Sequence, residues 1–124
     1  MTKKILLVDD SKFMRMRLKK QLVQADCEVV EAENGQDALD QVRMHAPQLV
    51  ICDVNMPIME GPEFVKMLFQ HDPTVPVIML TANPDRDLKF AVMDYNVRAF
   101  MSKLHPVEKI AEKILITYDR IYPS

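Results

Sequence analysis

The chain has 124 residues, of which 48% are hydrophobic, and a formal net charge of −2 at pH 7. This length fits a single domain over residues 1–124 with its own apolar core, and the charge leaves no basic field for direct binding to nucleic acid or a membrane surface. No apolar run approaches the roughly 20 residues of a spanning helix, and residues 1–4 lead into a short apolar run rather than a signal peptide, so we expect a cytoplasmic protein.

The first two elements are predicted to be a strand and a helix. Residues 4–8 form a run that is apolar from Ile5 onward and leads into the acidic pair Asp9 and Asp10. From Ser11 to about residue 25, apolar residues recur at spacings of three and four, which predicts an amphipathic helix. Its predicted inward residues are Phe13, Met14, Leu18, Leu22 and Val23.

A half-polar run over residues 27–32 predicts a strand at a sheet edge, and residues 37–45 predict a short helix that ends before Pro47. The apolar run 49–52 then leads directly into Asp53. This run is too short for a helix face, so it predicts a buried parallel strand. In the turn that follows, Pro57 cannot continue a strand ladder, and we expect Gly61 to take a backbone angle closed to other residues.

The second half of the chain repeats the same alternation. A helix is predicted from Pro62 to about residue 71, a strand over 75–80 that ends in Thr81, and a helix over 85–94 with Asn83 as its N-cap and Pro84 in its first turn. A strand over 97–102 then delivers Lys103, and a helix covers 106–118. Five alternations of strand and helix predict an α/β fold with a doubly wound parallel sheet and five helices on its two faces.

Parallel strands side by side bring the residues after them to one edge of the sheet. That edge would carry Asp9, Asp10 and Asp53, with Thr81 and Lys103 arriving from the last two strands. Three adjacent carboxylates repel one another unless a cation neutralises them. All-oxygen ligands without His or Cys suit Mg²⁺, or Mn²⁺, rather than zinc. The combination predicts a phosphoryl site in which Asp53 is the nucleophile.

These residues resemble a known family. The acidic pair Asp9 and Asp10, the Asp53-x-Asn55-Met56-Pro57…Gly61 loop, Thr81-Ala82 and Lys103 are similar to the motifs of the receiver domain of bacterial two-component response regulators, in particular the single-domain chemotaxis type. The resemblance covers essentially the whole chain. It implies a flavodoxin-like five-stranded sheet in the order 2-1-3-4-5.

The resemblance also implies roles for single residues. Asp53 would accept a phosphoryl group from a sensor histidine kinase or a phosphotransfer protein, and Thr81 and Lys103 would bind the phosphoryl oxygens. Mg²⁺ would be held by Asp10, Asp53 and the backbone carbonyl of Asn55, with Asp9 acting through a water. Phe100, three residues before the lysine, would switch rotamer with Thr81.

One departure from the family pattern concerns Lys103. A proline commonly follows this lysine, often in a cis bond, whereas Leu104 and His105 precede Pro106 here. Because a cis bond before a residue other than proline costs about 2.5–4 kcal/mol, we expect a trans Lys103-Leu104 bond.

Three functions remain open from the sequence. The first is a monomeric stand-alone receiver that signals by phosphorylation-dependent protein binding, as in chemotaxis or a phosphorelay, through the face made by the fourth helix, fifth strand and fifth helix. The second is the receiver half of a DNA-binding transcriptional regulator, and the third is an inactive scaffold, against which the complete set of site residues argues. None of the three is an enzyme acting on an external substrate, because self-phosphorylation and autodephosphorylation act only on the chain itself.

Overall fold

The computed structural model describes residues 2–83 and 85–124, and within them strands and helices alternate in the predicted order. The strands are β1 (Lys3–Val8), β2 (Cys27–Ala32), β3 (Leu49–Asp53), β4 (Val77–Thr81) and β5 (Val97–Ser102). The helices are α1 (Lys12–Gln24), α2 (Gly35–His45), α3 (Gly61–His71), α4 (Arg86–Val92) and α5 (Val107–Ile121). Among these residues, no helix combines the length and the apolar character needed to cross a membrane.

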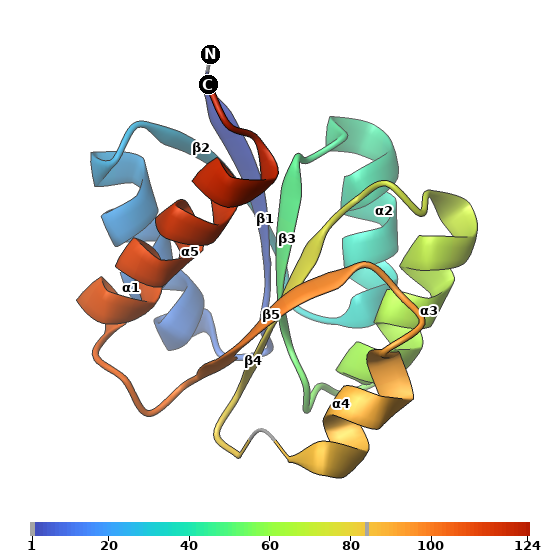
Figure 1. Ribbon diagram of the computed structural model, residues 1–124. Helices are drawn as coiled ribbons and strands as arrows, with labels where there is room; N and C mark the ends of the chain where they lie inside the picture. Colours follow the sequence, from blue (N-terminus) through green and yellow to red (C-terminus); the bar gives the residue numbers. More distant parts are fainter. Residues whose placement is uncertain (1, 84) are drawn as a thin grey trace.

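The five strands form one parallel sheet in the order β2-β1-β3-β4-β5 (Figure 1). The predicted fold class and strand order are therefore confirmed. Every residue of β3, the central strand, is buried, whereas β2 lies at the edge and keeps the partly exposed, half-polar pattern expected there. Asp53 thus ends a strand that is enclosed on both sides and both faces.

Helices cover both faces of the sheet (Figure 1), and an apolar core lies between the sheet and the helices on each face. On one face, α1 and α5 pack through residues such as Leu22 and Ile114; on the other, α2, α3 and α4 pack through residues such as Leu39 and Phe64. Full burial of an aliphatic or phenyl side chain contributes about 1.5–3 kcal/mol, so these cores provide the rigid frame on which the strand ends are held.

The apolar stripe of α1 is narrower than predicted. Leu18 and Leu22 are buried, but Phe13 is 64% exposed and Val23 is 49% exposed. At about 100° per residue, Phe13 lies some 140° around the helix from Leu18, and Val23 lies about 100° from Leu22. The predicted set of inward residues therefore combined residues from two different faces of the helix.

The start of α4 also differs from the prediction. Its N-cap is Asp85, whose carboxylate accepts a hydrogen bond from the Leu88 N–H at 2.8 Å, and not Asn83. The Asn83 N–H instead donates to the Thr81 hydroxyl at 3.2 Å. The predicted position of Pro84 in the first turn of this helix lies outside the described residues.

Candidate functional site

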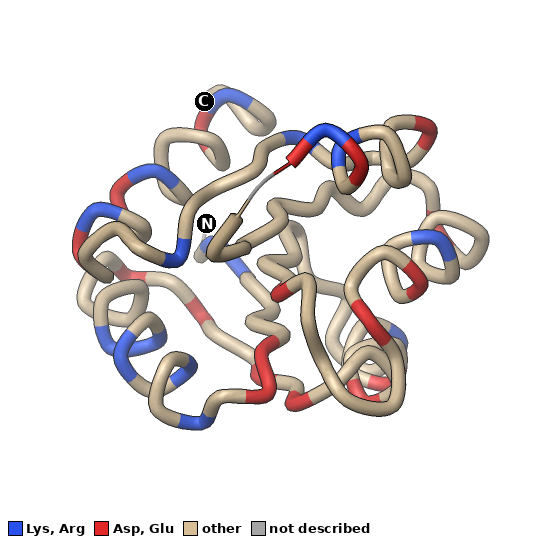
Figure 2. Tube along the Cα trace, turned by 90° about the horizontal axis from the view of Figure 1, so that it is seen from below, with Lys and Arg blue, Asp and Glu red and all other residues tan. Residues whose placement is uncertain are grey.

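The predicted site residues come from four neighbouring strands that end at the same edge of the sheet. Asp9 and Asp10 follow β1, Asp53 ends β3, Thr81 ends β4 and Lys103 follows β5. Figure 2 looks onto this edge and shows acidic positions near the middle of the molecule, with Lys and Arg positions concentrated along neighbouring helices. Asp9, Asp53 and Thr81 are buried, whereas Asp10 is exposed.

Lys103 points into this acidic centre. Its Nζ lies 2.8 Å from Asp9 Oδ2 and 3.0 Å from Asp53 Oδ2, so one ammonium group faces two carboxylates. The backbone also holds Lys103 in place. The Lys103 N–H donates to the Thr81 carbonyl at 2.9 Å, which continues the pairing of β4 with β5 past the end of the strand.

The missing proline after Lys103 does not turn the side chain away from the site. The described residues contain no cis peptide bond, in agreement with the expected trans Lys103-Leu104 bond. The Leu104 N–H donates to the Ser102 hydroxyl at 3.1 Å, which holds the turn immediately after β5. The lysine therefore reaches the carboxylates without a proline beside it.

The surroundings of Asp53 make its ionisation less favourable than in water. Burial, and next the negative charge of Asp9, raise the pKa of Asp53 to about 6, although the Lys103 contact and the Asn55 N–H oppose the rise. Burial acts to lower the pKa of Lys103, but its contacts with Asp9 and Asp53 outweigh that effect and raise it. The Lys103 ammonium therefore stays charged, but its positive charge only partly compensates the negative charges of Asp9 and Asp53.

The three carboxylates lie close enough together to share one hard cation. One oxygen from each of Asp9, Asp10 and Asp53 lies within 4.8 Å of the other two. Asp9 Oδ2 is buried and meets the Lys103 ammonium, but within the described residues it accepts no well-directed hydrogen bond. Mg²⁺ uses carboxylate and carbonyl oxygens of this kind and keeps several waters. The acidic cluster could bind a metal, and its donor set fits Mg²⁺.

The loop between β3 and α3 corrects one prediction. Gly61 does not take a left-handed backbone angle; that angle belongs to Ile58, at φ 69°. The reason for a glycine at position 61 is close approach, because a Cβ there would lie 2.5 Å from the Asp53 carbonyl oxygen and 2.9 Å from Val54 Cα. The Gly61 N–H also donates to the Val54 carbonyl at 2.8 Å. The loop is folded tightly against the backbone of the Asp53 strand.

Thr81 and Phe100 lie on the side of the site that leads towards α4. The Thr81 hydroxyl accepts a hydrogen bond from the Asn83 N–H, and its side chain is buried at the end of β4. Phe100, on β5, is half-buried against the core beneath α2, α3 and α4, with the Lys89 ammonium 5.7 Å from its ring centroid. The exposed Asn55 lies in the loop after β3, next to the acidic cluster.

Sequence reasoning missed one residue that contacts the site. Arg15, on the first turn of α1, donates from Nη1 to the carbonyl oxygen of Asp9. In the sequence Arg15 lies among the polar residues between the apolar positions of the predicted amphipathic helix, and it is not among the predicted site residues. Its position six residues after Asp9, on a helix capped by Ser11, was the available signal.

A model of the response regulator receiver domain matches residues 5–115. The chain belongs to this family. It is 36% identical to the chemotaxis protein CheY of Bacillus subtilis over 115 residues, which cover 92% of this chain and 96% of the relative. It is 30% identical to CheY of Thermotoga maritima, with the same coverage of both chains.

The chain also matches part of some longer relatives. The Bacillus subtilis transcriptional regulatory protein PhoP, of alkaline phosphatase synthesis, is 32% identical over 103 residues, which cover 83% of this chain and 43% of that protein. Among solved structures, Vibrio cholerae chemotaxis protein CheY4 superimposes with a TM-score of 0.87 at 28% identity, covering 94% of this chain and 99% of that one. The receiver fold therefore spans nearly the whole chain.

Proposed function

We propose that the chain is a stand-alone response regulator, formed by a single receiver domain over residues 1–124, that acts as a monomer in the cytoplasm. It accepts a phosphoryl group on Asp53 from a histidine kinase or a phosphotransfer protein and signals by binding another protein when phosphorylated. One observation carries this proposal: the buried Asp53 carboxylate lies 3.0 Å from the Lys103 ammonium and within 4.8 Å of two further carboxylates.

In the proposed reaction, an Asp53 carboxylate oxygen attacks the phosphorus of a phosphohistidine. A P–O bond forms to Asp53 while the P–N bond to the imidazole breaks, and the imidazole leaves with the electron pair of that bond. Lys103 and the Thr81 hydroxyl bind phosphoryl oxygens and reduce the charge that develops on them.

Mg²⁺ would be held by Asp10, Asp53 and the backbone carbonyl of Asn55, and by Asp9 through a water, with Mn²⁺ as an alternative. When bound, the ion neutralises carboxylate and phosphoryl charge during transfer. The protein residues bring the acceptor oxygen, the ammonium and the hydroxyl to one point, and the buried β3 behind Asp53 keeps water from that side. The product is modified protein, so the proposed role is signalling and not turnover of an external substrate.

The test is phosphorylation by a small acyl phosphate in the presence of Mg²⁺, followed by mass spectrometry of the intact protein. We expect one added phosphoryl group in the wild type, none in Asp53→Asn, and wild-type labelling in the control Asp94→Asn, which changes an exposed carboxylate after α4. Full labelling of Asp53→Asn would refute Asp53 as the acceptor.

The proposed output surface is the face formed by α4, β5 and α5. Its exposed apolar residues Phe90 and Met93 stand beside basic side chains, so a partner with acidic residues around an apolar anchor fits best. The charged residues of this face include Arg86, Lys89, Arg98, Lys109 and the half-buried Lys113, with the acidic Asp87, Glu108 and Glu112 interspersed.

A second candidate function is the receiver part of a DNA-binding regulator. The match to 43% of PhoP favours it, because that relative carries a receiver within a longer transcriptional regulatory protein. Sequencing the gene beyond the codon for Ser124 decides between the two, since a DNA-binding domain encoded in frame would support the second function.

A further inference from the structure

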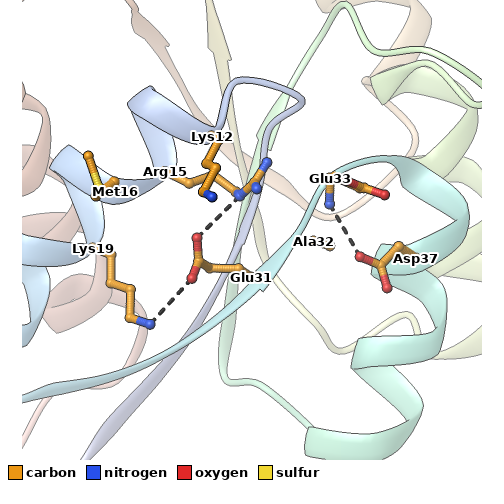
Figure 3. A pocket seen from close by; sticks show the side chains of 8 residues that line it. All are labelled: Lys12, Arg15, Met16, Lys19, Glu31, Ala32, Glu33 and Asp37. Atoms are coloured by element: carbon orange, nitrogen blue, oxygen red, sulfur yellow. Dashed lines mark hydrogen bonds and ion pairs between the residues drawn. The ribbon is translucent and has the colours of Figure 1, made fainter.

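Arg15 contacts both the backbone of Asp9 and Glu31 of the neighbouring strand β2. Figure 3 shows the contact with Glu31. Arg15 Nη1 donates to the Asp9 carbonyl oxygen, and Arg15 Nε lies 3.2 Å from Glu31 Oε1. The second Glu31 oxygen lies 3.3 Å from Lys19 Nζ. The Arg15 side chain is only 13% exposed, so the guanidinium is held between α1 and the ends of β1 and β2.

The contact with Arg15 completes the anchoring of Asp9. The Asp9 N–H donates to the Ala32 carbonyl at 3.1 Å, and Asp9 Oδ1 accepts the Ser11 N–H at 2.9 Å. These bonds leave Asp9 Oδ2 directed at Lys103. The Asp9 carbonyl is part of the peptide plane that joins Asp9 to Asp10, so a donor on this oxygen fixes the direction in which Asp10 leaves the sheet.

We infer that Arg15 is a positioning residue for the metal site: it orients the Asp9–Asp10 peptide so that both carboxylates face the cation, and Glu31 holds its guanidinium in place. The inference rests on the proposed Mg²⁺ site. Groups behind the ligands of a metal orient those ligands, and their removal commonly weakens metal affinity about 10- to 100-fold. Arg15 has this relation to the acidic cluster, since it binds the backbone of one ligand and touches no carboxylate of the cluster.

Charge and positioning predict opposite outcomes when Arg15 is replaced. A positive charge beside the cluster repels a metal cation, so if charge were its only effect, Arg15→Gln would strengthen Mg²⁺ binding. If Arg15 orients the peptide, the same variant weakens binding. The double variant Arg15→Gln/Glu31→Gln removes the contact while leaving the net charge unchanged, which isolates the positioning effect.

The experiment is an NMR titration of the folded, metal-free protein with Mg²⁺ alone, read from the amide shifts of residues 9, 10 and 53. We expect the dissociation constant to rise about tenfold in Arg15→Gln and in the double variant. Arg15→Lys should recover part of the lost Mg²⁺ affinity. Its ammonium can reach the Asp9 carbonyl, but it lacks the planar guanidinium that bonds this carbonyl and Glu31 at the same time. The control is Arg17→Gln, which removes the same charge from an exposed position where the guanidinium lies over the Phe13 ring; its Mg²⁺ affinity should stay within twofold of the wild type.

Denaturant unfolding of each metal-free variant separates positioning from a general loss of stability. Weaker Mg²⁺ binding in variants that are folded supports the inference, and unchanged or tighter binding in Arg15→Gln and the double variant overturns it. If Arg15→Gln does not fold, Arg15→Lys decides, because its charge is retained and a loss of affinity can only come from the contact. A wild-type protein that binds no Mg²⁺ would overturn the proposed metal site itself, a result distinct from failure of the Arg15 inference.

Discussion

Asp53 is placed where the folded protein disfavours its negative charge. Burial and the nearby Asp9 carboxylate raise the pKa of Asp53 to about 6, compared with about 3.9 for an aspartate in an unfolded chain. Folding therefore binds a proton to Asp53 more tightly than the unfolded state does. This favourable contribution is complete below about pH 4 and is lost as the pH rises through about 6.

The pH dependence of stability follows from this difference. In Asp53→Asn the contribution is absent, so the variant should gain stability relative to the metal-free wild type as the pH rises from 4 to above 6. The difference in pKa corresponds to on the order of 3 kcal/mol. Denaturant unfolding in the presence of a chelator, at several pH values over this range, measures it. A stability difference that does not vary with pH would contradict the raised pKa.

Asp10 should contribute more to metal binding than to the repulsion among the three carboxylates. Its side chain is exposed, and Asp9 rather than Asp10 is the carboxylate that acts on Asp53. Solvent screens an exposed charge, so Asp10→Ala should leave the metal-free free energy of unfolding equal to that of the wild type or slightly above it. The same variant should weaken Mg²⁺ binding and reduce the stabilisation that added Mg²⁺ gives. A clear loss of metal-free stability would refute this assignment.

Single residues of the site differ in how well the sequence could locate them. Asp9, Asp53 and Thr81 follow apolar runs, and parallel pairing brings such residues to one edge of the sheet. The contact of Arg15 with the Asp9 backbone depends on how α1 crosses the end of β1, which no periodicity encodes. Asp9 and Asp53 were therefore predictable as site residues. For Arg15 the sequence gives only its position six residues after Asp9, and not its contact with the Asp9–Asp10 peptide.

At the scale of elements, apolar runs predicted the strands because central parallel strands are buried on both faces. The ends of helices were less predictable. The N-cap of α4 is Asp85, whose carboxylate accepts the Leu88 N–H, and α5 runs to Ile121, where Tyr118 and Tyr122 bond to Gln48. The end of α5 is thus supported by tertiary contacts that the local sequence does not reveal.

Gly61 provides a test of the packing between the loop and β3. A Cβ at this position would press on the Asp53 carbonyl oxygen and on Val54 Cα, which are backbone atoms that cannot turn aside. Gly61→Ala should destabilise the protein by about 1–3 kcal/mol, as overpacking of a tight site does. It should also slow phosphorylation of Asp53, because relief of the clash displaces the strand end.

Gly35→Ala is the matched control for this prediction. Its Cβ would meet only side-chain atoms of Met59 among its nearest contacts, Cγ and Sδ at 2.9 Å and Cβ at 3.0 Å, which can shift more readily than backbone atoms. Gly35 is also the first residue of α2, where alanine fits the helical backbone. Thermal or denaturant unfolding of both variants compares them directly. If Gly61→Ala were as stable as Gly35→Ala, close backbone approach would not be the reason for a glycine at position 61.

At the scale of the whole molecule, the site and the proposed output surface are joined through β4 and β5. Thr81 ends β4 beside the acidic centre, and Phe100 lies on the paired strand β5, half-buried near α4. We expect a phosphoryl group on Asp53 to draw the Thr81 hydroxyl from the Asn83 N–H and so open space for the ring to move inward. Because Phe100 is already half-buried, the gain is a fraction of full ring burial, about 1 kcal/mol, which biases two conformations about fivefold.

NMR can test whether phosphorylation of Asp53 affects the output surface through Thr81 and Phe100. We expect a beryllium fluoride mimic of the phosphoryl group, added with Mg²⁺, to shift amides across residues 86–113 of the wild type and to shift them much less in Phe100→Ala, because alanine leaves no ring to fill the space that Thr81 vacates. The control is Phe90→Ala, which removes an equal ring from α4 at a position 73% exposed and outside the core, so its response should match the wild type apart from the altered helix surface. Changes near Asp53 itself should persist in all three proteins, which verifies that the mimic is bound. If residues 86–113 respond equally in Phe100→Ala, or if the largest distant changes fall on α1, the coupling does not run through the ring and the output surface lies elsewhere.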